Sequence, residues 1–430
     1  MNTRFYNAKI LVLDAENHFS IAEDELHVTG DTITYIGPGR KADPDAAETT
    51  VFDREIDARG NLLIPGFKNA HTHTPMTFLR SYADDLPLHE WLERQVFPNE
   101  AKLAGDDVYW LNILGIMEYL TSGITANFDM YFFPESNAKA SIDCGFRTVQ
   151  TSGFNNFSSS LEELEEDYYR VNEMGELASF ILGFHAEYTT SRDRMEGLAA
   201  LANKVKSPVF LHNAETALEV KECKERWGMT PTGLTDALGM YTYGGGGYHC
   251  IHMEDGDFEI FKKRQLTAVT NPASNLKLAS GIAPIKRYLD EGIALAIGTD
   301  GPASNNCLDM FREMFLTTAL AKVKEQDLYQ NLIYYIEEHL EEELSLEKLA
   351  GAFFVSRYYV AHVFKEQAGI SVHQYILKKR MQASREAILG GENISQVYER
   401  FGFRDYSSFY RAFRREYGMS PKEYREERLR

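Results

Sequence analysis

Two histidines stand two positions apart in the segment NAHTH, at His71 and His73. Alternate residues of a β-strand share a face, so this spacing directs both imidazole rings to the same side of a strand. Two neutral imidazoles, completed by a third histidine and a carboxylate, form a ligand set for Zn²⁺ or Fe²⁺. Candidates for the missing ligands are His212, His249 and Asp300. The pair alone is a weak signal, but all five residues together predict a metal site.

The elements that must position these residues are eight apolar runs that begin at about residue 63. Each run ends in polar or ionisable residues and precedes a helix-like segment. This number of strand–helix units in roughly 240 residues is expected of a (β/α)8 barrel, whose active site lies at the C-terminal ends of the strands. We therefore predict an α/β fold built on such a barrel. The runs are LIPGFKNAHTH, ITANFDM, FRTVQT, FILGFHAEY, PVFLHNAE, YHCIHM, AVTNPAS and ALAIGTD.

The segments on either side of the predicted barrel have different patterns. Residues 5–60 read as short strands with alternating apolar residues and turns, which predicts part of a β-sandwich. After residue 327, helix-like segments follow one another with short breaks. We therefore expect partial β-sandwich strands at residues 1–62, the barrel at 63–326 and an all-α domain at 327–430.

The charge is distributed unevenly along the 430 residues, whose net charge is −19. From Gly351 onward the chain holds 15 Lys and Arg against 9 Asp and Glu, so a basic tail follows an acidic body. This asymmetry is typical of a protein whose last part contacts nucleic acid. No apolar run reaches the roughly 18 residues that a membrane crossing needs, and the four cysteines lie far apart. We expect reduced thiols, a cytoplasmic location and no membrane partner.

Four long motifs surround the candidate ligands, and they read IPGFKNAHTHTPMTFLRSYADDLPLHEWL, FLHNAET, YHCIH and NPASNLKLASGIAPI followed by GTDGPASNN. Over residues 5–324 or so, the chain thereby resembles the amidohydrolase superfamily, and within it the 5-methylthioadenosine/S-adenosylhomocysteine deaminases and related aminohydrolases. The resemblance implies a metal-dependent hydrolase that deaminates a purine nucleoside, such as methylthioadenosine or adenosine, or a related heterocycle. It also implies one divalent metal ion, with Zn²⁺ expected first and Fe²⁺ as the alternative.

Carried over residue by residue, the resemblance implies distinct roles around that ion. Glu215 would carry a proton to the ring nitrogen of the purine, and His249 would lie near the attacking water and the leaving amine. Asp300 would act twice, as a metal ligand and as the acceptor of a proton from the water. The implied metal ligands are His71, His73, His212 and Asp300. The residues implied on the substrate side are Trp91, Glu100, His185 and Ser304.

Two segments depart from the pattern of that group. Where the group often has an arginine for the distal part of its ligand, this chain reads Thr151-Ser152-Gly153. A ligand of the S-adenosylhomocysteine type is therefore less well supported than deamination itself. The segment HAEYT carries Glu187 where the group has a proline, which would place a carboxylate by the expected pocket.

The tail carries a second set of motifs, from LSLEKLAGAFFVSRYYVAHVF to ISQVYERFGFRDYSSFYRAFRREYGMSPKEYR. They resemble the AraC/XylS-type DNA-binding domain, which implies two helix-turn-helix units joined by a long helix, and double-stranded DNA as the partner. The second helices of the two units are expected to begin near Ser356 and Asp405. The residues expected on the DNA side are Arg357, Tyr358, His362, Ser407, Ser408, Arg411, Arg414 and Arg415.

Each of these second helices has two apolar residues four positions apart, Val360 with Phe364 and Phe409 with Phe413. Residues at this spacing share one face of a helix, so both pairs are expected to pack inward. The opposite faces then remain for contact with phosphates and base edges.

Four interpretations of the whole chain remain open from the sequence, and a homo-oligomer is compatible with each. The first is a two-module protein, with an aminohydrolase-like barrel and a sequence-specific transcription-regulator domain. The second is an active deaminase whose tail is vestigial, and the third is a transcription regulator whose barrel senses a ligand without turning it over. The fourth is a truncated, non-functional enzyme fusion, because in the resembling group the chain continues past the eighth strand and completes the β-sandwich. Without that continuation, the N-terminal strands would keep open edges and one bare apolar face.

Overall fold

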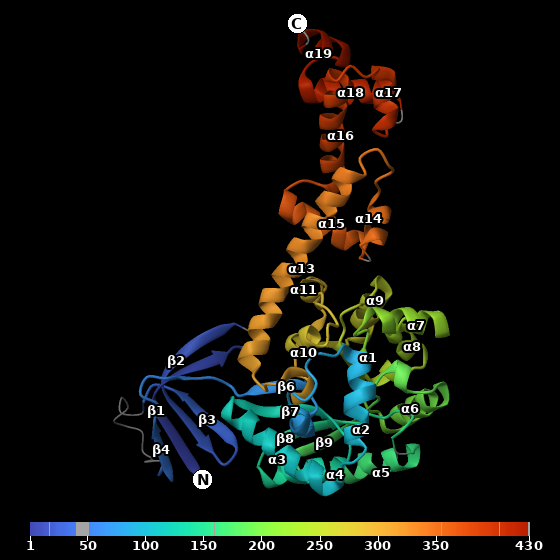
Figure 1. The fold of residues 1–430 in the computed structure, drawn as a ribbon. Coiled ribbons are helices and arrows are strands. Elements are labelled where there is room, and N and C mark those ends of the chain that lie inside the picture. Colours follow the sequence, from blue (N-terminus) through green and yellow to red (C-terminus); the bar gives the residue numbers. More distant parts are fainter. Residues whose placement is uncertain (17, 40–50, 159, 354, 404, 429–430) are drawn as a thin grey trace. The chain divides into compact units, whose positions relative to one another are not determined.

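Figure 1 shows the fold in the computed structural model, which describes residues 1–16, 18–39, 51–158, 160–353, 355–403 and 405–428. The chain forms two compact units, Met1–Phe67 and Lys68–Arg430. Within the described residues, no helix is both long enough and apolar enough to cross a membrane.

The first unit is a five-stranded sheet with the order β3-β2-β1-β4, in which β5 also pairs with β1. β1 and β2 run antiparallel, whereas β4 and β5 run parallel to β1. Ala8 and Ile10, two positions apart on β1, lie in its small core, while Phe19, Ile21 and Ile33 are exposed. The strands are β1 (Asn2–Leu13), β2 (Phe19–Thr29), β3 (Thr32–Gly37), β4 (Arg54–Asp57) and β5 (Leu62–Leu63).

The second unit contains an eight-stranded sheet in the order β13-β12-β11-β10-β9-β8-β7-β6. Each predicted apolar run supplies one strand, so the (β/α)8 barrel is confirmed. The two ends of the sheet approach each other where the backbone N–H of Asp300 donates to the carbonyl of His71, at 2.9 Å. The strands are β6 (Phe67–Thr72), β7 (Ile124–Met130), β8 (Arg147–Thr151), β9 (Ala178–Gly183), β10 (Val209–Asn213), β11 (Gly245–His249), β12 (Thr267–Thr270) and β13 (Ala294–Ile297).

β11 depends on its glycines. A Cβ atom at Gly245 would lie 2.0 Å from the carbonyl oxygen of Val209, and one at Gly246 would lie 2.1 Å from that of Thr267. Larger residues would therefore push β11 away from β10 and β12, which flank it. Because His249 ends this strand, the glycines help to fix the position of a candidate site residue.

Helices connect the barrel strands, and several begin at a side chain that accepts a backbone N–H, as Ser160, Thr216 and Thr230 do. Their apolar faces pack on strand residues such as Leu182 and Val209, which are fully buried. The helical segments of the barrel are η2 (Thr74–Leu79), α1 (Leu88–Trp91), η3 (Leu92–Val96), α2 (Phe97–Glu100), α3 (Gly105–Thr121), α4 (Pro134–Asp143), α5 (Leu161–Asn172), η4 (Glu187–Thr189), α6 (Arg192–Val205), α7 (Ala217–Trp227), α8 (Pro231–Ala237), η5 (Met240–Tyr243), α9 (Asp255–Arg264), α10 (Pro272–Lys277), α11 (Ile285–Asp290) and α12 (Pro302–Asn305).

The C-terminal part is helical, as predicted. The second helices, α15 and α18, begin directly after Ser356 and Asp405, which cap them. Both predicted apolar pairs are buried, with 0% exposure at Val360, Phe364, Phe409 and Phe413. The helices are α13 (Met310–Glu338), α14 (Leu346–Ala352), α15 (Arg357–Ala368), α16 (Val372–Leu389), α17 (Ile394–Arg400), α18 (Tyr406–Tyr417) and α19 (Pro421–Arg428).

Helix α13 belongs to both the barrel and this helical part. In its first turn, the Glu313 carboxylate accepts hydrogen bonds from the Ala273 backbone N–H and the Asn305 side chain, at 3.0 and 2.9 Å. Near its end, Leu332 and Ile336 are fully buried in the core that includes α14 and α15. One continuous helix therefore links the strand-end loops of the barrel to the first helix-turn-helix unit.

Candidate metal centre, catalytic site and DNA-binding surface

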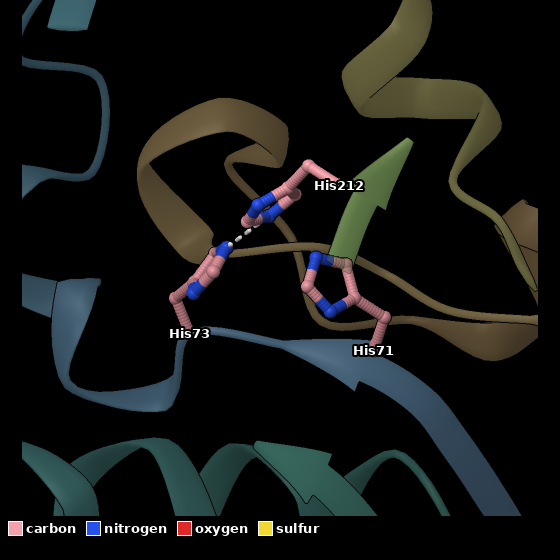
Figure 2. A group of neighbouring side chains, drawn as sticks. All are labelled: His71, His73 and His212. Atoms are coloured by element: carbon pink, nitrogen blue, oxygen red, sulfur yellow. Dashed lines mark hydrogen bonds between the residues drawn. The ribbon is translucent and has the colours of Figure 1, made fainter. Parts of the chain in front are cut away.

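The candidate metal ligands come from three strands of the barrel. His71 is the fifth residue of β6 and His73 follows that strand, while His212 lies on β10 and Asp300 follows β13. All are at the C-terminal ends, as the sequence predicts. Figure 2 shows the three imidazole rings turned toward a common space between the strands.

The distances between these side chains are those of a coordination shell. The Nε2 atoms of His73 and His212 lie 3.3 Å apart, and Asp300 Oδ1 lies 3.2 Å from His73 Nε2 and 3.4 Å from His71 Nε2. Nitrogen and oxygen ligands lie about 2.0–2.2 Å from a zinc ion, so two ligand atoms of one ion are at most roughly 4.4 Å apart. The three distances fall within this limit.

Hydrogen bonds orient the rings for metal binding. His73 Nδ1 donates to the carbonyl of Met130 at 2.6 Å, and His212 Nδ1 donates to the carbonyl of His185 at 2.7 Å. Each hydrogen bond places a proton on Nδ1 and turns Nε2, the nitrogen that would bind the metal, toward the site. Neither ring nitrogen of the buried His71 has a hydrogen-bond partner in the described chain. A buried imidazole without a hydrogen-bond partner is expected of a metal ligand. The three histidines are therefore suited to hold a divalent ion.

The electrostatics of the site favour an ionised Asp300 beside the histidines. Burial raises the pKa of Asp300, but the neighbouring His71 and His73 side chains outweigh it and hold this pKa well below its usual range. Burial lowers the pKa of His71 to about 3 and that of His212 well below its usual value, so both rings are neutral. Burial also acts to lower the pKa of His73, yet the bond to Asp300 raises it to about 9. Metal binding must therefore displace one proton from His73.

Ser304, predicted near the metal, lies against Asp300. Its hydroxyl donates to Asp300 Oδ2 at 2.8 Å, and Ser274 donates to the same oxygen at 2.6 Å. The backbone of Asp300 is left-handed, with φ of 60°, and so is that of His249, with φ of 67°. Non-glycine residues rarely adopt this conformation, and where they do the surrounding structure must hold them. The strand-end positions of both residues are thus fixed at some cost in backbone strain.

Glu215 and His249 form the candidate acid–base pair. Glu215 Oε1 accepts a hydrogen bond from Ser280 at 2.8 Å, and Oε2 lies 3.7 Å from His249 Nε2. His249 Nδ1 lies 2.7 Å from Asn275 Oδ1. Burial raises the pKa of Glu215, so this carboxyl retains a proton more readily than a solvated one. A buried, protonated carboxyl beside the metal ligands can act as a general acid.

Several positioning residues escaped the sequence analysis. Ser274, Asn275 and Ser280 lie on or just after α10. No motif or spacing in the sequence marks their hydroxyl and amide groups as part of a site. Glu219 could have been found, because Thr216 and Glu219 have the spacing of a capping box. Its carboxylate accepts backbone N–H groups of Ala214, Glu215 and Thr216, at 3.0, 2.8 and 3.4 Å. It thereby holds the turn that presents Glu215.

The predicted substrate-side residues line one chamber of about 60 Å³. Trp91, Glu100 and His185 lie there together with Glu215 and the metal ligands His73, His212 and Asp300. Burial raises the pKa of Glu100 to about 7, and its Oε1 atom has no hydrogen-bond partner among the described residues. Such an atom can accept a hydrogen bond from a ligand hydroxyl.

Glu187 is turned away from this chamber. Its carboxylate accepts hydrogen bonds from Arg226 Nη2 at 2.7 Å and Trp227 Nε1 at 2.6 Å, both at the end of α7. The expectation of a carboxylate by the pocket is therefore wrong, because two donors on α7 bind Glu187 from the outer side. Its neighbour Tyr188 lines the chamber instead.

The residues predicted to face DNA lie on α15 and α18. Arg357 and Tyr358 are exposed and His362 is half-buried on α15, where the Tyr358 and His362 rings stack. Arg357 also forms an ion pair with Glu347 at 2.7 Å. On α18 the exposed or half-buried side chains opposite the core are Ser407, Ser408, Arg411, Arg414 and Arg415.

Two family models match different parts of the chain. A model of the Amidohydrolase family matches residues 62–333. A model described as a helix-turn-helix domain matches residues 349–427, the part that bears the AraC-type motifs.

Individual relatives agree with the first match. A 5-methylthioadenosine/S-adenosylhomocysteine deaminase of Thermoanaerobacter pseudethanolicus is 37% identical over 336 residues, which cover 76% of each chain. One of Pyrococcus furiosus is 37% identical over 71% of this chain and 73% of its own. Among solved structures, an adenosine deaminase from Xanthomonas campestris with bound zinc has a TM-score of 0.68 and 31% identity, covering 75% of this chain and 74% of that one.

Proposed function

This chain belongs to the amidohydrolase family, and on that premise we propose that its barrel hydrolytically deaminates a purine nucleoside, such as methylthioadenosine or adenosine. We propose further that its helix-turn-helix part binds double-stranded DNA. The observation that carries the first proposal is the convergence of His71, His73, His212 and Asp300 beside the Glu215–His249 pair. This arrangement combines a metal shell with a buried acid, which a deamination requires.

The proposed reaction replaces an amino group on the purine ring with an oxygen from water. A divalent ion in this shell would supply a water molecule acidified toward neutrality. Asp300 accepts the proton of the attacking water, and Glu215 delivers its proton to the adjacent ring nitrogen. His249 lies between them, 3.7 Å from Glu215 Oε2 and 4.0 Å from Asp300 Oδ2, where it can orient the water and the leaving amine. The ring carbon gains a C–O bond; the proton held by Asp300 then passes to the amino group, the C–N bond breaks, and ammonia leaves. As the carbonyl forms, the proton of the new hydroxyl restores Glu215 to its acid form.

Relatives named as deaminases of 5-methylthioadenosine and S-adenosylhomocysteine, at 37% identity, support a purine nucleoside as the substrate class. The zinc in the adenosine deaminase structure supports Zn²⁺ as the ion, with Fe²⁺ as the alternative that the same ligands allow. On the substrate side we propose Trp91, Glu100 and His185 as contacts to the base and ribose.

Deamination is tested with the purified full chain. Metal content is determined by mass spectrometry, and adenosine and methylthioadenosine are followed by ammonia release and by the ultraviolet change on conversion to the inosine type. We expect ammonia release that depends on the bound metal. A metal-loaded, folded protein that releases no ammonia from any purine nucleoside would contradict the proposal.

For DNA binding we propose that α15 and α18 enter successive major grooves. Arg357 and Arg411 would read base edges, whereas Arg414 and Arg415 would contact phosphates. A gel shift with promoter DNA at several salt concentrations tests this, since phosphate contacts make the affinity fall with salt. The absence of any shift at low salt would contradict it.

A ligand-responsive regulator is a second candidate, favoured by helix α13. Glu313 in its first turn holds Ala273 and Asn305, the neighbours of Ser274 and Ser304, and both of these serines bind Asp300. The other end of the helix lies in the core of the first helix-turn-helix unit. If nucleoside binding is coupled to DNA binding, a turnover-deficient Glu215→Gln chain should change its DNA affinity when nucleoside is added. An unchanged affinity would leave deamination as the only role of the barrel.

A further inference from the structure

A second, larger cavity adjoins the catalytic chamber. Its volume is about 1020 Å³, and it shares with the chamber Phe97, Glu100, Tyr131, Phe132, Gly153 and Asn155. A ligand held beside the metal ligands could therefore extend into it. We call this space the distal cavity.

Part of the wall of the distal cavity is apolar. It includes Phe132 and Phe154 from strand-end loops, Leu164 from α5 and Phe180 from β9. Phe154 and Leu164 are 2% exposed and Phe180 is 3% exposed, so these side chains are held by the barrel core. Such a wall favours an alkyl, thioether or aromatic group by removing its apolar surface from water.

Charged groups in the distal cavity are mostly acidic. The lining holds five carboxylates, Glu100, Glu135, Glu163, Glu166 and Asp167, and two cations, Lys139 and Arg170.

Both cations already have anionic partners. Arg170 lies 3.1 Å from Glu135 and 3.7 Å from Glu166, and Lys139 Nζ lies 2.5 Å from Asp143. Asp167 is half-buried on α5, and burial raises its pKa, although the nearby Arg170 opposes this. Among the described lining residues, no cation is left without an acidic partner.

The segment Thr151-Ser152-Gly153 supplies no cation either. The Ser152 hydroxyl donates to the carbonyl of Gly183 at 2.5 Å, and it also accepts the Gly183 N–H at 3.2 Å. Gly153 lies over Met130, since a Cβ atom there would be 3.5 Å from Met130 Cγ. A carboxylate or phosphate in this space would meet like charges, apolar rings and occupied hydroxyls.

We propose that the distal cavity selects the substituent that the substrate carries beyond its nucleoside core, admitting apolar or positively charged groups and rejecting anionic ones. This inference rests on the proposed deamination, and it narrows the substrate class to 5′-substituted nucleosides without a negative charge. Because Glu135 and Glu166 are exposed and share Arg170, solvent screens part of the repulsion between the lining and an anion, and we expect roughly a 3- to 10-fold lower kcat/KM for an anionic substrate.

The test uses the metal-loaded full chain and a matched series of adenosines whose 5′ groups differ in charge. Methylthioadenosine is the neutral member, 5′-amino-5′-deoxyadenosine the cationic one, and adenosine 5′-carboxylate and adenosine 5′-phosphate are the anionic ones. We expect kcat/KM to be lower for both anions than for the other two. Equal or higher values for the anions would overturn the inference.

Substitutions in the lining test whether the distal cavity causes the lower kcat/KM of the anionic substrates. The double substitution Glu166→Gln with Asp167→Asn removes two carboxylates from α5 and should narrow the gap between anionic and neutral substrates several-fold. Glu162→Gln is the matched control, because Glu162 is exposed on the same helix and is not part of the cavity lining. An unchanged gap in the double variant, with the fold intact by circular dichroism, would place the selection elsewhere and contradict the assignment.

Failure of the deamination proposal can be distinguished from failure of this one. If no member of the series is turned over, the deamination proposal fails. Calorimetric binding of the same compounds then decides the charge preference alone. Weaker binding of the two anions would uphold the selectivity, and equal or tighter binding of the anions, or no binding by any member, would overturn it.

Discussion

The Nε2 atoms of His73 and His212 lie 3.3 Å apart, although the two residues are separated by 139 positions in the chain. Each ring is held from behind by a hydrogen bond from its Nδ1 atom to a backbone carbonyl. Two imidazole nitrogens at this distance can bind the same cation, so the distance fits a metal centre (Figure 2).

Loss of one ring should therefore remove the metal. We expect His73→Ala to lower the metal content far below that of the unchanged chain, measured by mass spectrometry after gel filtration. The melting temperature should fall as well, since an ion that binds only the native state stabilises it. His18→Ala is the control, because His18 is exposed in the N-terminal sheet unit. A His73→Ala protein that keeps its full metal content would refute the ligand assignment.

The acid role of Glu215 can be separated from metal binding. Glu215→Gln keeps the shape of the side chain but cannot donate a carboxyl proton, so kcat should fall by about 10²- to 10⁴-fold while the metal content is retained. Ammonia release and metal analysis on the same preparation measure both. Glu225→Gln on α7, exposed in the structure, should have wild-type activity. Turnover within a few-fold of wild type in the Glu215 variant would show that another group supplies the proton.

DNA affinity should depend on the exposed face of α18. Substituting Arg411→Ala and Arg414→Ala together should weaken binding, and each lost phosphate contact should reduce the slope of log affinity against log salt by about 0.9. Fluorescence anisotropy over a range of salt concentrations gives both quantities. Lys102→Ala, at an exposed position of the barrel, should alter neither. Identical salt slopes for the double variant and the unchanged chain would exclude α18 from the interface.

Folding stability should depend on pH through Glu313. Burial raises the pKa of this carboxyl to about 7 from 4.5, in spite of its hydrogen bonds and of Arg312 at 3.6 Å. Between these values the native state holds a proton that the unfolded state has released, so stability falls as pH rises from about 4.5 to 7. Glu313→Gln should flatten this decline even where it lowers stability at every pH.

Urea unfolding at several pH values measures the decline. Glu196→Gln, on an exposed part of α6, serves as the control and should keep the pH dependence of the unchanged chain. An equally steep decline in Glu313→Gln would show that other carboxyls cause it.

Much of the fold could be predicted because its signals are local. Eight apolar runs with polar ends determine eight strands, and the four-residue spacing of Phe409 and Phe413 determines the inward face of α18, where both are 0% exposed. The two-residue spacing of His71 and His73 likewise predicts that both rings point to one side, because side chains alternate along a strand. In each case the periodicity of one element decides which way its side chains point.

The direction of Glu187 could not be predicted, because it depends on partners outside its own segment. The sequence placed this carboxylate by the pocket, whereas Arg226 and Trp227 on α7 draw it to the outer side. Ser280 and Asn275 could not be assigned for the same reason, since their partners Glu215 and His249 are 65 and 26 positions away.

Short-range spacing in the sequence predicted the type of barrel and the kinds of metal ligand, whereas the role of Glu215 as the acid and the helix-turn-helix pattern were implied by the family resemblances. Only the tertiary structure decided that His73 lies 3.3 Å from His212 and 3.2 Å from Asp300, and that a cavity lined by five carboxylates adjoins the catalytic chamber. Those properties arise when distant strand ends meet at one mouth of the barrel. Burial and charge there depend on neighbours that no local pattern specifies.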